Sequence, residues 1–452
     1  MKPTKTRTPD VIRPSCVLAL VVLIGMRDAA SATDLVRSIP ELQRRIARAT
    51  AGDVIVVGNG VYTTMAAITV DRAGTSGRPI RIRAETPGGV EISGTHGFTV
   101  TSPAAFVEID GFRFTHAAGQ TSIASGATHI RFTRNVFECA GQGAYLTVAG
   151  DDAEIDRNEL RNKKTLGNMI DVRGAGRQVA QRVWIHHNYF HDFADAGGNG
   201  AETIRFGHSD LSLSKGLGLI EHNLFARCTG ENELITNKSC ANTYRYNTFV
   251  DSPKAQLTLR HGNDCLVYGN VFRGTDGIRI FGDRHQVFGN YLERNTTGIQ
   301  IGNGDGEVAD GAKLTSHDRP DGAVITFNTL VDNARSYFMG RRPGGLGATR
   351  TVFAHNILQG GGDAATIEGP YPDAEWTGNI LWQTGGPGDM PKGAYEIVNP
   401  LLVADPGGVL RPGPSSPALE RARGGHPPVE VDTNAMAPLT PEALLRLIRD
   451  PR

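Results

Sequence analysis

The stretch Val183-Trp-Ile-His-His-Asn188-Tyr-Phe decides the fold, because a near copy, Leu219-Ile-Glu-His-Asn223-Leu-Phe, follows one repeat later. In each copy, alternating apolar residues lead to an asparagine, and an apolar or aromatic residue follows it. The intervals between successive asparagines of this phrase are 20 to 38 residues, and the series is Asn135, Asn158, Asn188, Asn223, Asn247, Asn270, Asn290, Asn328, Asn356 and Asn379. A period in the twenties with insertions indicates a solenoid.

A second set of alternating segments accompanies the asparagine phrase, for example at residues 169–173, 257–260 and 277–280. Alternation with a period of two is typical of a strand with one buried face. Asparagine suits the turn, because its short side chain tolerates left-handed backbone and can bond to the asparagine of the next coil. We therefore predict an all-β fold, a single-stranded right-handed parallel β-helix whose coils rise about 4.8 Å each.

The predicted solenoid needs a cover at its open end. Residues 40–49 fit an amphipathic capping helix, with Ser38 before it and Leu42 and Ile46 on one face. The domain plan is a β-helix over residues 33–403 and an irregular Gly- and Pro-rich tail over 404–452, in which residues 441–448 favour one last helix.

The N-terminal residues 1–32 are typical of a signal peptide. Basic residues precede an apolar run at 16–26, and Ala30-Ser31-Ala32 offers a small-residue cleavage site. We expect export, either to the periplasm or out of the cell. Four widely spaced cysteines (Cys139, Cys228, Cys240 and Cys265) would remain; their spacing favours buried packing over a disulfide framework or a zinc site, although export permits a bridge.

The chain carries 47 Lys and Arg against 47 Asp and Glu, so its formal net charge is zero. No global basic field favours a nucleic acid or a membrane surface as partner. An anionic partner must therefore be held by a local cluster. We expect a monomer.

One segment combines acidic and basic residues in a compact pattern. Glu231 and Glu233 lie two residues apart, so a strand places both side chains on one face. Lys238, Arg260 and Arg279 lie nine, ten and eleven residues before the asparagines of their coils, which predicts that the three cations are close together on adjacent coils. Each residue alone is typical of a solvated surface. The joint pattern favours a functional site.

Three sequence blocks carry a family resemblance. The blocks Asn-Glu-Leu-Ile-Thr-Asn-Lys238-Ser, Leu-Thr-Leu-Arg260-His261-Gly and Gly-Ile-Arg279-Ile resemble the signature blocks of polysaccharide lyase family six, which contains alginate lyases and chondroitinase B. Residues 51–62 are similar to the opening coils of that family. The resemblance implies a β-helix enzyme that cleaves uronate-containing polymers by β-elimination, usually with calcium.

The resemblance also implies roles. Calcium prefers oxygen ligands, which Glu231, Glu233 and Asn199 would supply, with Glu202 as a competing choice for Asn199. Lys238 is the expected base, and Arg260 the expected acid or electrostatic partner of the leaving oxygen. His261 and Arg279 are expected to hold substrate carboxylates, although His261 could instead point inward at the turn.

The polymer itself is decided outside these blocks. Residues 208–216 and 303–320 resemble insertions that could wall a cleft, and such loops usually choose the substrate. We expect alginate, because no sulfate-binding arginine cluster stands outside the blocks. A dermatan sulfate lyase, a C5-epimerase and a non-catalytic polysaccharide-binding β-helix are the alternatives.

Overall fold

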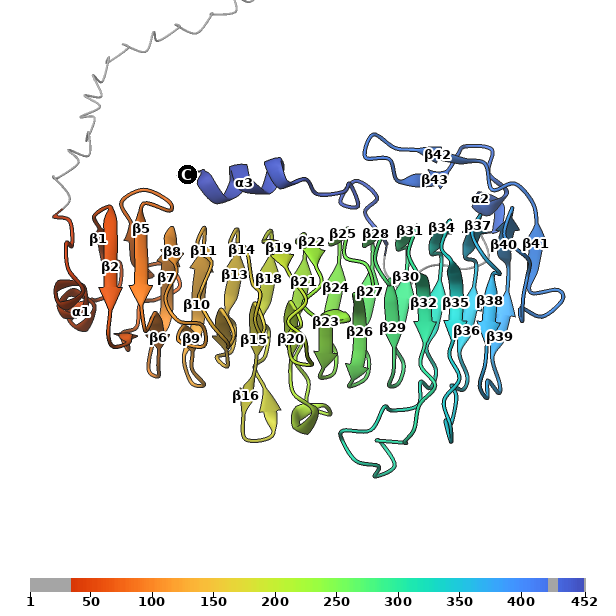
Figure 1. Ribbon diagram of the computed structural model, residues 1–452, viewed down its shortest axis with the longest axis horizontal. Helices are drawn as coiled ribbons and strands as arrows, with labels where there is room; N and C mark the ends of the chain where they lie inside the picture. Colours follow the sequence, from red (N-terminus) through yellow and green to blue (C-terminus); the bar gives the residue numbers. More distant parts are fainter. Residues whose placement is uncertain (1–33, 422–429, 451–452) are drawn as a thin grey trace, which may run out of the picture. The chain divides into compact units, whose positions relative to one another are not determined.

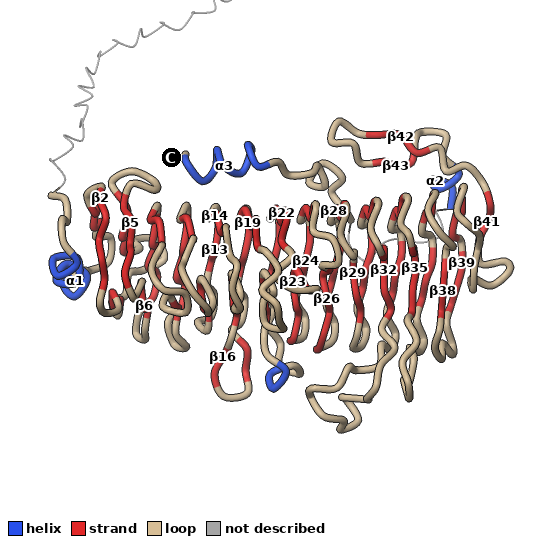
Figure 2. The backbone as a smooth tube through the Cα atoms, in the orientation of Figure 1, coloured by secondary structure: helices blue, strands red, loops and turns tan. Residues whose placement is uncertain are grey.

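A computed structural model describes residues 34–421 and 430–450 of the chain (Figure 1). The predicted signal peptide lies outside these residues. Within them, no helix is both long and apolar enough to cross a membrane. The predicted parallel β-helix is confirmed: each coil gives one strand to each of three long parallel sheets, seen in red in Figure 2.

The strands of the three sheets follow one another along the solenoid. The first sheet has the order β1 (Val54–Val57), β4 (Ile80–Ala84), β7 (Ala105–Asp110), β10 (Thr128–Thr133), β13 (Glu154–Asp156), β18 (Trp184–His186), β21 (Leu219–Glu221), β24 (Thr243–Arg245), β27 (Leu266–Tyr268), β30 (Gln286–Phe288), β33 (Val324–Thr326), β36 (Val352–Ala354) and β39 (Glu375–Thr377). The second has the order β2 (Gly60–Thr64), β5 (Val90–Gly94), β8 (Phe112–Phe114), β11 (Val136–Phe137), β14 (Glu159–Arg161), β19 (Tyr189–Phe193), β22 (Leu224–Cys228), β25 (Thr248–Val250), β28 (Val271–Arg273), β31 (Tyr291–Glu293), β34 (Thr329–Val331), β37 (Ile357–Gln359), β40 (Asn379–Trp382) and β41 (Tyr395–Ile397). The third has the order β3 (Ile68–Val70), β6 (Phe98–Val100), β9 (Ser122–Ile123), β12 (Leu146–Val148), β15 (Ile170–Val172), β20 (Ile204–Phe206), β23 (Glu233–Lys238), β26 (Gln256–His261), β29 (Ile278–Ile280), β32 (Thr297–Ile301), β35 (Arg335–Met339) and β38 (Ala365–Ile367).

The core is a stack of like residues from successive coils. Phe190, Phe225, Phe249 and Phe272 are fully buried, and their ring centroids are 4.7, 4.7 and 4.5 Å apart. These separations match the spacing of neighbouring strands. The alternation in the sequence therefore becomes continuous apolar columns along the axis. All four cysteines of the predicted mature chain are free and buried, as predicted.

The repeated asparagines form a hydrogen-bonded ladder between the first and second sheets. Asn188 donates from its backbone and its side chain to the Asn223 Oδ1 atom at 3.0 Å, and Asn223 bonds to Asn247 in the same way. The expected left-handed residue is not the asparagine but the one before it: His187 has φ 54° and His222 φ 53°. The asparagine is needed for its side chain, which must pair with buried backbone groups.

The first coil is covered by α1 (Ile39–Arg48), as predicted. Ser38 caps the helix by accepting a hydrogen bond from the Glu41 backbone amide at 3.3 Å, and Leu42 and Ile46 are buried. The solenoid thus ends in a helix instead of an open edge.

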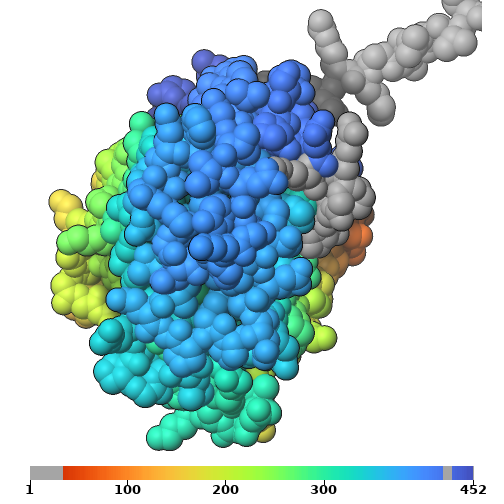
Figure 3. All heavy atoms as spheres, turned by 90° about the vertical axis from the view of Figure 1, so that its right-hand side faces the viewer, coloured from red at the N-terminus to blue at the C-terminus, as the bar shows by residue number. Residues whose placement is uncertain are grey.

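Three insertions leave the solenoid at the same kind of turn, between a strand of the third sheet and the next strand of the first. They are the hairpin of β16 (Gly174–Ala175) and β17 (Gln178–Val179), the loop with the 3-10 helix η1 (Ser209–Leu211), and residues 303–320. All three project on the lower side in Figure 1. In the end-on view of Figure 3, residues 303–320 again project from the lower edge.

The C-terminal tail is more ordered than the predicted irregular segment. It contains the antiparallel pair β42 (Leu402–Ala404) and β43 (Leu410–Pro412), then α2 (Pro417–Arg421) and α3 (Pro441–Arg449), which lies along the coils in Figure 1. The physical reason is burial of outward-facing apolar residues. Val409 and Met436 pack with Tyr268 and its neighbours. Leu444 and Ile448 of α3 pack against residues of earlier coils of the solenoid.

Candidate active site

The predicted site residues gather on the outer face of the third sheet. Leu257 and Leu259 of β26 point into the core, so the alternating Gln256, Thr258 and Arg260 face outward. The β23 strand lies on one side of β26 and β29 on the other. Three adjacent coils therefore carry Glu233, Lys238, Arg260 and Arg279.

The register differs from the prediction in one respect. Arg279 pairs with Thr258, which places it one outward position before Arg260. Lys238 pairs with His261, and the register shifts between Asn237 and Lys238. This local irregularity displaces Lys238 relative to Arg260, whereas Arg279 is placed by a regular pairing of β26 with β29, so the three cations do not share the expected phase.

Three carboxylates form the acidic part of the site. Glu202, Glu231 and Glu233 each offer an oxygen, and these oxygens lie within 4.8 Å of one another. Burial raises the pKa of Glu231 to about 7, and the neighbouring Glu202 adds to the effect. Buried like charges at this distance are stabilised by a cation.

Hydrogen bonds fix the positions of the carboxylates. Glu231 accepts from the backbone amides of Gly200 and Ala201 at 2.7 and 3.3 Å. The Asn168 side chain donates to Glu202 at 2.7 Å, and the Thr236 hydroxyl donates to Glu233. The oxygens are therefore held together by neighbouring coils.

The structure brings Glu202 into the acidic cluster, where the sequence had favoured Asn199 and kept Glu202 as the competitor. Glu202 is 2% exposed, whereas the Asn199 side chain is exposed. Asn199 still precedes Gly200, whose amide bonds to Glu231. Its role as a ligand stays a prediction.

The basic side chains lie on the same face, beside the carboxylates. The Lys238 Nζ atom lies 3.8 Å from the Glu202 Oε1 atom, and the Arg279 Nη1 atom lies 3.9 Å from the Glu233 Oε1 atom. Burial lowers the pKa of both Arg260 and Arg279, but neither guanidinium loses its charge at neutral pH. The buried Arg260 Nη1 and Arg279 Nε atoms have no hydrogen-bond partner among the described residues. Unpaired buried donors of this kind suit an anionic ligand.

His261 is buried, with 3% of its surface exposed. His261 pairs with Lys238 beyond the register shift, so the alternation of Leu257 and Leu259 does not set the direction of its side chain. Burial, with Arg260 and Lys238 nearby, lowers the pKa of His261 to about 3. Its imidazole is therefore neutral at physiological pH. A neutral imidazole can still donate one hydrogen bond to a carboxylate, so the role of His261 in substrate binding stays a prediction.

The insertion at residues 303–320 is joined to the site by residues that the sequence prediction did not include. Arg342 donates to Asp305 and to the Asn303 carbonyl at 3.2 Å, and it lies 3.0 Å from the His317 Nδ1 atom. Arg260, Arg342 and Arg279 each help to lower the pKa of His317, to about 4, although burial contributes most. Arg342 stands outside the three sequence blocks, and only the folded coils bring it near them.

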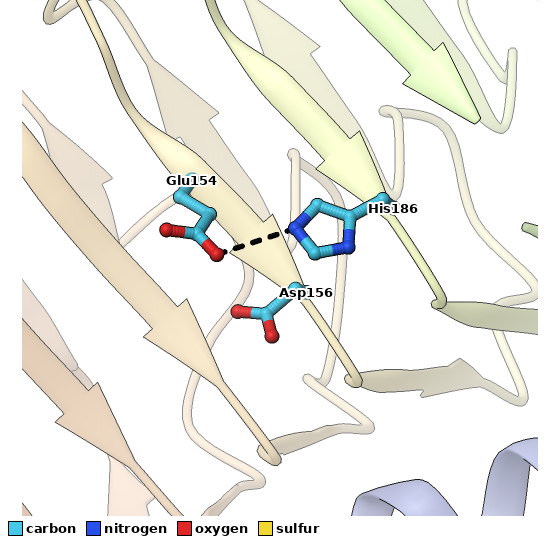
Figure 4. Close-up of side chains that lie close together, drawn as sticks. All are labelled: Glu154, Asp156 and His186. Atoms are coloured by element: carbon cyan, nitrogen blue, oxygen red, sulfur yellow. Dashed lines mark hydrogen bonds and ion pairs between the residues drawn. The ribbon is translucent and has the colours of Figure 1, made fainter. Parts of the chain in front are cut away.

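A second acidic cluster lies on the first sheet and has a different character (Figure 4). There His186 bonds to Glu154 at 3.2 Å, while Asp156 accepts from Arg131 at 2.7 and 2.8 Å and from Arg157 at 2.7 Å. The two guanidinium groups already neutralise these carboxylates. This cluster is a salt-bridge network and lacks the uncompensated charge of the first.

Comparison with protein families shows to which family the chain belongs. The Chondroitinase B family matches residues 36–341, which is more than half of the chain. The chain belongs to polysaccharide lyase family six.

Solved structures agree with this family six assignment. The chain is 26% identical to the family six alginate lyase AlyGC, with a TM-score of 0.78 over 90% of this chain. It spans 58% of the length of AlyGC. A mannuronic acid specific family six lyase from human gut microbiota is also 26% identical, with a TM-score of 0.66 over 76% of this chain and 84% of that one. Comparison with curated proteins gives no match.

The residues present fit the calcium ion that family six implies. Calcium takes six to eight oxygen ligands. Three carboxylates converge here without a guanidinium directly bonded to them, and the buried Gln256 Oε1 atom has no partner among the described residues. The donor set is entirely oxygen, which suits a hard cation and not zinc.

Proposed function

We propose that this family six protein is a secreted or periplasmic lyase that cleaves a uronate polymer, alginate, by calcium-assisted β-elimination. The observation that carries the proposal is the position of Lys238 and Arg260 on adjacent strands beside three converging carboxylates, two of them on buried residues. A polysaccharide-binding module has no need of an amine beside a cation site. Two 26% identical relatives, the alginate lyase AlyGC and the mannuronic acid specific gut lyase, support alginate as the polymer.

The chain's own groups would divide the work as follows. Lys238, as the free amine, would take the C5 proton of the uronate. The electron pair of the C5–H bond then forms the C4–C5 double bond while the bond from C4 to the glycosidic oxygen breaks. Arg260 would stabilise the negative charge on the leaving oxygen, which takes up a proton from solvent. Arginine is a reluctant proton donor, so electrostatic stabilisation is its main role.

Substrate carboxylates would be held by the unpaired donors. Arg279 offers its buried Nε atom, and its guanidinium is positioned over the Phe281 ring at 4.8 Å. Calcium bound by Glu231, Glu233 and either Glu202 or Asn199 would neutralise the uronate carboxylate and so make the C5 proton more acidic. His261, buried beside Lys238 in the register, would help to orient the substrate.

One assay tests the proposal. The purified mature chain is mixed with alginate, dermatan sulfate or pectate, with and without a calcium chelator, and the absorbance of the unsaturated uronate product is followed. We expect a chelator-sensitive rise on alginate, lost in Lys238→Ala and retained in Lys392→Ala, a matched exposed lysine. No rise on any uronate polymer would refute the lyase.

The same assay tests the dermatan alternative, which the chondroitinase B family match favours. A rise on dermatan sulfate without one on alginate would replace the proposed polymer. Exchange of the C5 proton with solvent but no chain cleavage would indicate an epimerase.

A further inference from the structure

Gln256 is a buried amide in an unusual position. It begins β26, its neighbour in the register across β23 is Glu233, and only 3% of its surface is exposed. Its Oε1 atom has no hydrogen-bond partner among the described residues. A buried acceptor left unpaired costs about 1–3 kcal/mol, so its retention calls for a ligand.

The direction of the side chain limits what that ligand is. Gln256 faces outward with Thr258 and Arg260, on the same face as Glu233. Opposed side chains on neighbouring strands lie about 4.5–5.5 Å apart at their Cβ atoms. The unpaired oxygen is therefore beside the Glu202, Glu231 and Glu233 cluster, and any partner for it must come from that space.

We propose that Gln256 supplies a fourth protein oxygen to the divalent cation held by these three carboxylates. The inference rests on the proposed function only in that it takes calcium to bind there; it does not require that a polymer is cut. Amide oxygens are common calcium ligands in proteins. A neutral oxygen adds a ligand without changing the charge of the cluster.

The charge balance agrees with a neutral fourth ligand. Three carboxylates exceed the charge of one divalent cation by a single negative charge. Lys238 and Arg279 lie 3.8 and 3.9 Å from two of those carboxylates, and their two positive charges more than offset that excess. A fourth ligand therefore needs no charge of its own, and a neutral amide oxygen is sufficient.

Calcium titration of the mature chain by calorimetry, without substrate, tests the proposal. Gln256→Leu removes the oxygen at similar size, and we expect about a tenfold loss of calcium affinity. Gln256→Glu keeps an oxygen at this position and is expected to bind calcium at least as tightly as wild type. Gln286→Leu is the matched control, because Gln286 also has an unpaired buried Oε1 atom but lies on the first sheet.

The outcomes separate this proposal from the proposed function. Wild-type affinity in Gln256→Leu overturns the fourth ligand even if the enzyme is active. If Gln256→Leu loses calcium affinity and the wild-type protein cuts no uronate polymer, Gln256 is supported as a ligand and the lyase proposal is refuted. If Gln256→Leu does not fold by circular dichroism, Gln256→Glu decides, since weaker binding there overturns the proposal. A wild-type chain that binds no calcium also overturns it.

Discussion

The Lys238 ammonium lies 3.8 Å from the Glu202 carboxylate, so the proposed base is paired with a member of the acidic cluster. A cation bound at Glu202 competes with this ion pair. Lys238→Met is therefore expected to lose lyase activity while it binds calcium as tightly as wild type, or more tightly. Calorimetry and the absorbance assay on the same preparation check both halves. A variant that binds calcium more weakly would show that Lys238 supports the cation site.

Calcium is expected to stabilise the fold through the acidic cluster. At a calcium concentration 100 times its Kd, a ligand that binds only the folded state adds about 2.7 kcal/mol, which thermal unfolding with and without a chelator measures as a rise in Tm. Glu231→Gln should lose this rise. Glu154→Gln, in the salt-bridge network of Figure 4, should keep it. The reverse pattern would indicate that the cation binds at the cluster on the first sheet.

Arg342 is expected to position the 303–320 loop for substrate binding. Arg342→Gln removes the bonds to Asp305 and Asn303, so we expect KM for alginate to rise more than kcat falls. The neighbouring Arg341 is exposed, and Arg341→Gln is the control. Steady-state kinetics of the two variants decide; equal effects would mean that general charge, and not the loop anchor, matters.

The asparagine ladder is expected to be a large contributor to stability. Asn223→Ala removes donor bonds to Ile185 and Asn247 and the acceptor for the Asn188 amide. Each buried group left unpaired costs about 1–3 kcal/mol, so the free energy of unfolding should fall by roughly 3 kcal/mol or more. Denaturant unfolding measures this, with the exposed Asn162→Ala as control. A fall of the same size in both variants would contradict the ladder's role.

Lys163 provides a pH-dependent test of the core. It is 1% exposed, donates to the Gly143 carbonyl at 2.8 Å, and burial lowers its pKa to about 8. The unfolded lysine has a pKa of about 10.4, so between these values the unfolded chain binds more protons and wild-type stability rises with pH. Relative to Lys163→Met, wild type should gain up to about 3 kcal/mol from pH 8 to 10.4. Denaturant unfolding across this range checks it.

The control for this effect is the exposed neighbour Lys164. The stability difference between wild type and Lys164→Met should not change over the same pH range. A flat difference for Lys163→Met as well would mean that its amine is not perturbed in the folded chain.

Much of the fold could be predicted because successive coils repeat the same pattern of side chains. The period of the asparagines and the alternation around them predict coils, and Ser38, Leu42 and Ile46 predict the capping helix. The left-handed residue was assigned to the asparagine instead of its predecessor, because composition at the turn does not separate the two positions. The tail is ordered by apolar contacts with distant segments, and no local sequence pattern predicts such contacts.

The sequence predicted most of the residues of the site, but not how their strands pair. Glu233 and Lys238 are an odd number of residues apart, so the register shifts beside each of them, and not a period of two alone, set how they lie against β26. Arg279 pairs with Thr258 in a regular register, and the gathering of Gln256 and Arg342 arises from the stacking of coils. These relations join residues that are distant in the sequence, so spacing within one segment could not show them.

The returning tail changes how the solenoid would come apart. A simple solenoid has only nearest-neighbour interactions, and its coils can fray one by one from either end. Here Arg273 bonds to the Gly408 carbonyl at 2.7 Å, Leu439 to the Thr248 hydroxyl at 3.0 Å, and Arg134 to the Asp450 carbonyl at 2.7 Å. The tail therefore acts as a strap between distant coils, so that loosening a coil that holds the tail also weakens the hold of the tail on the others.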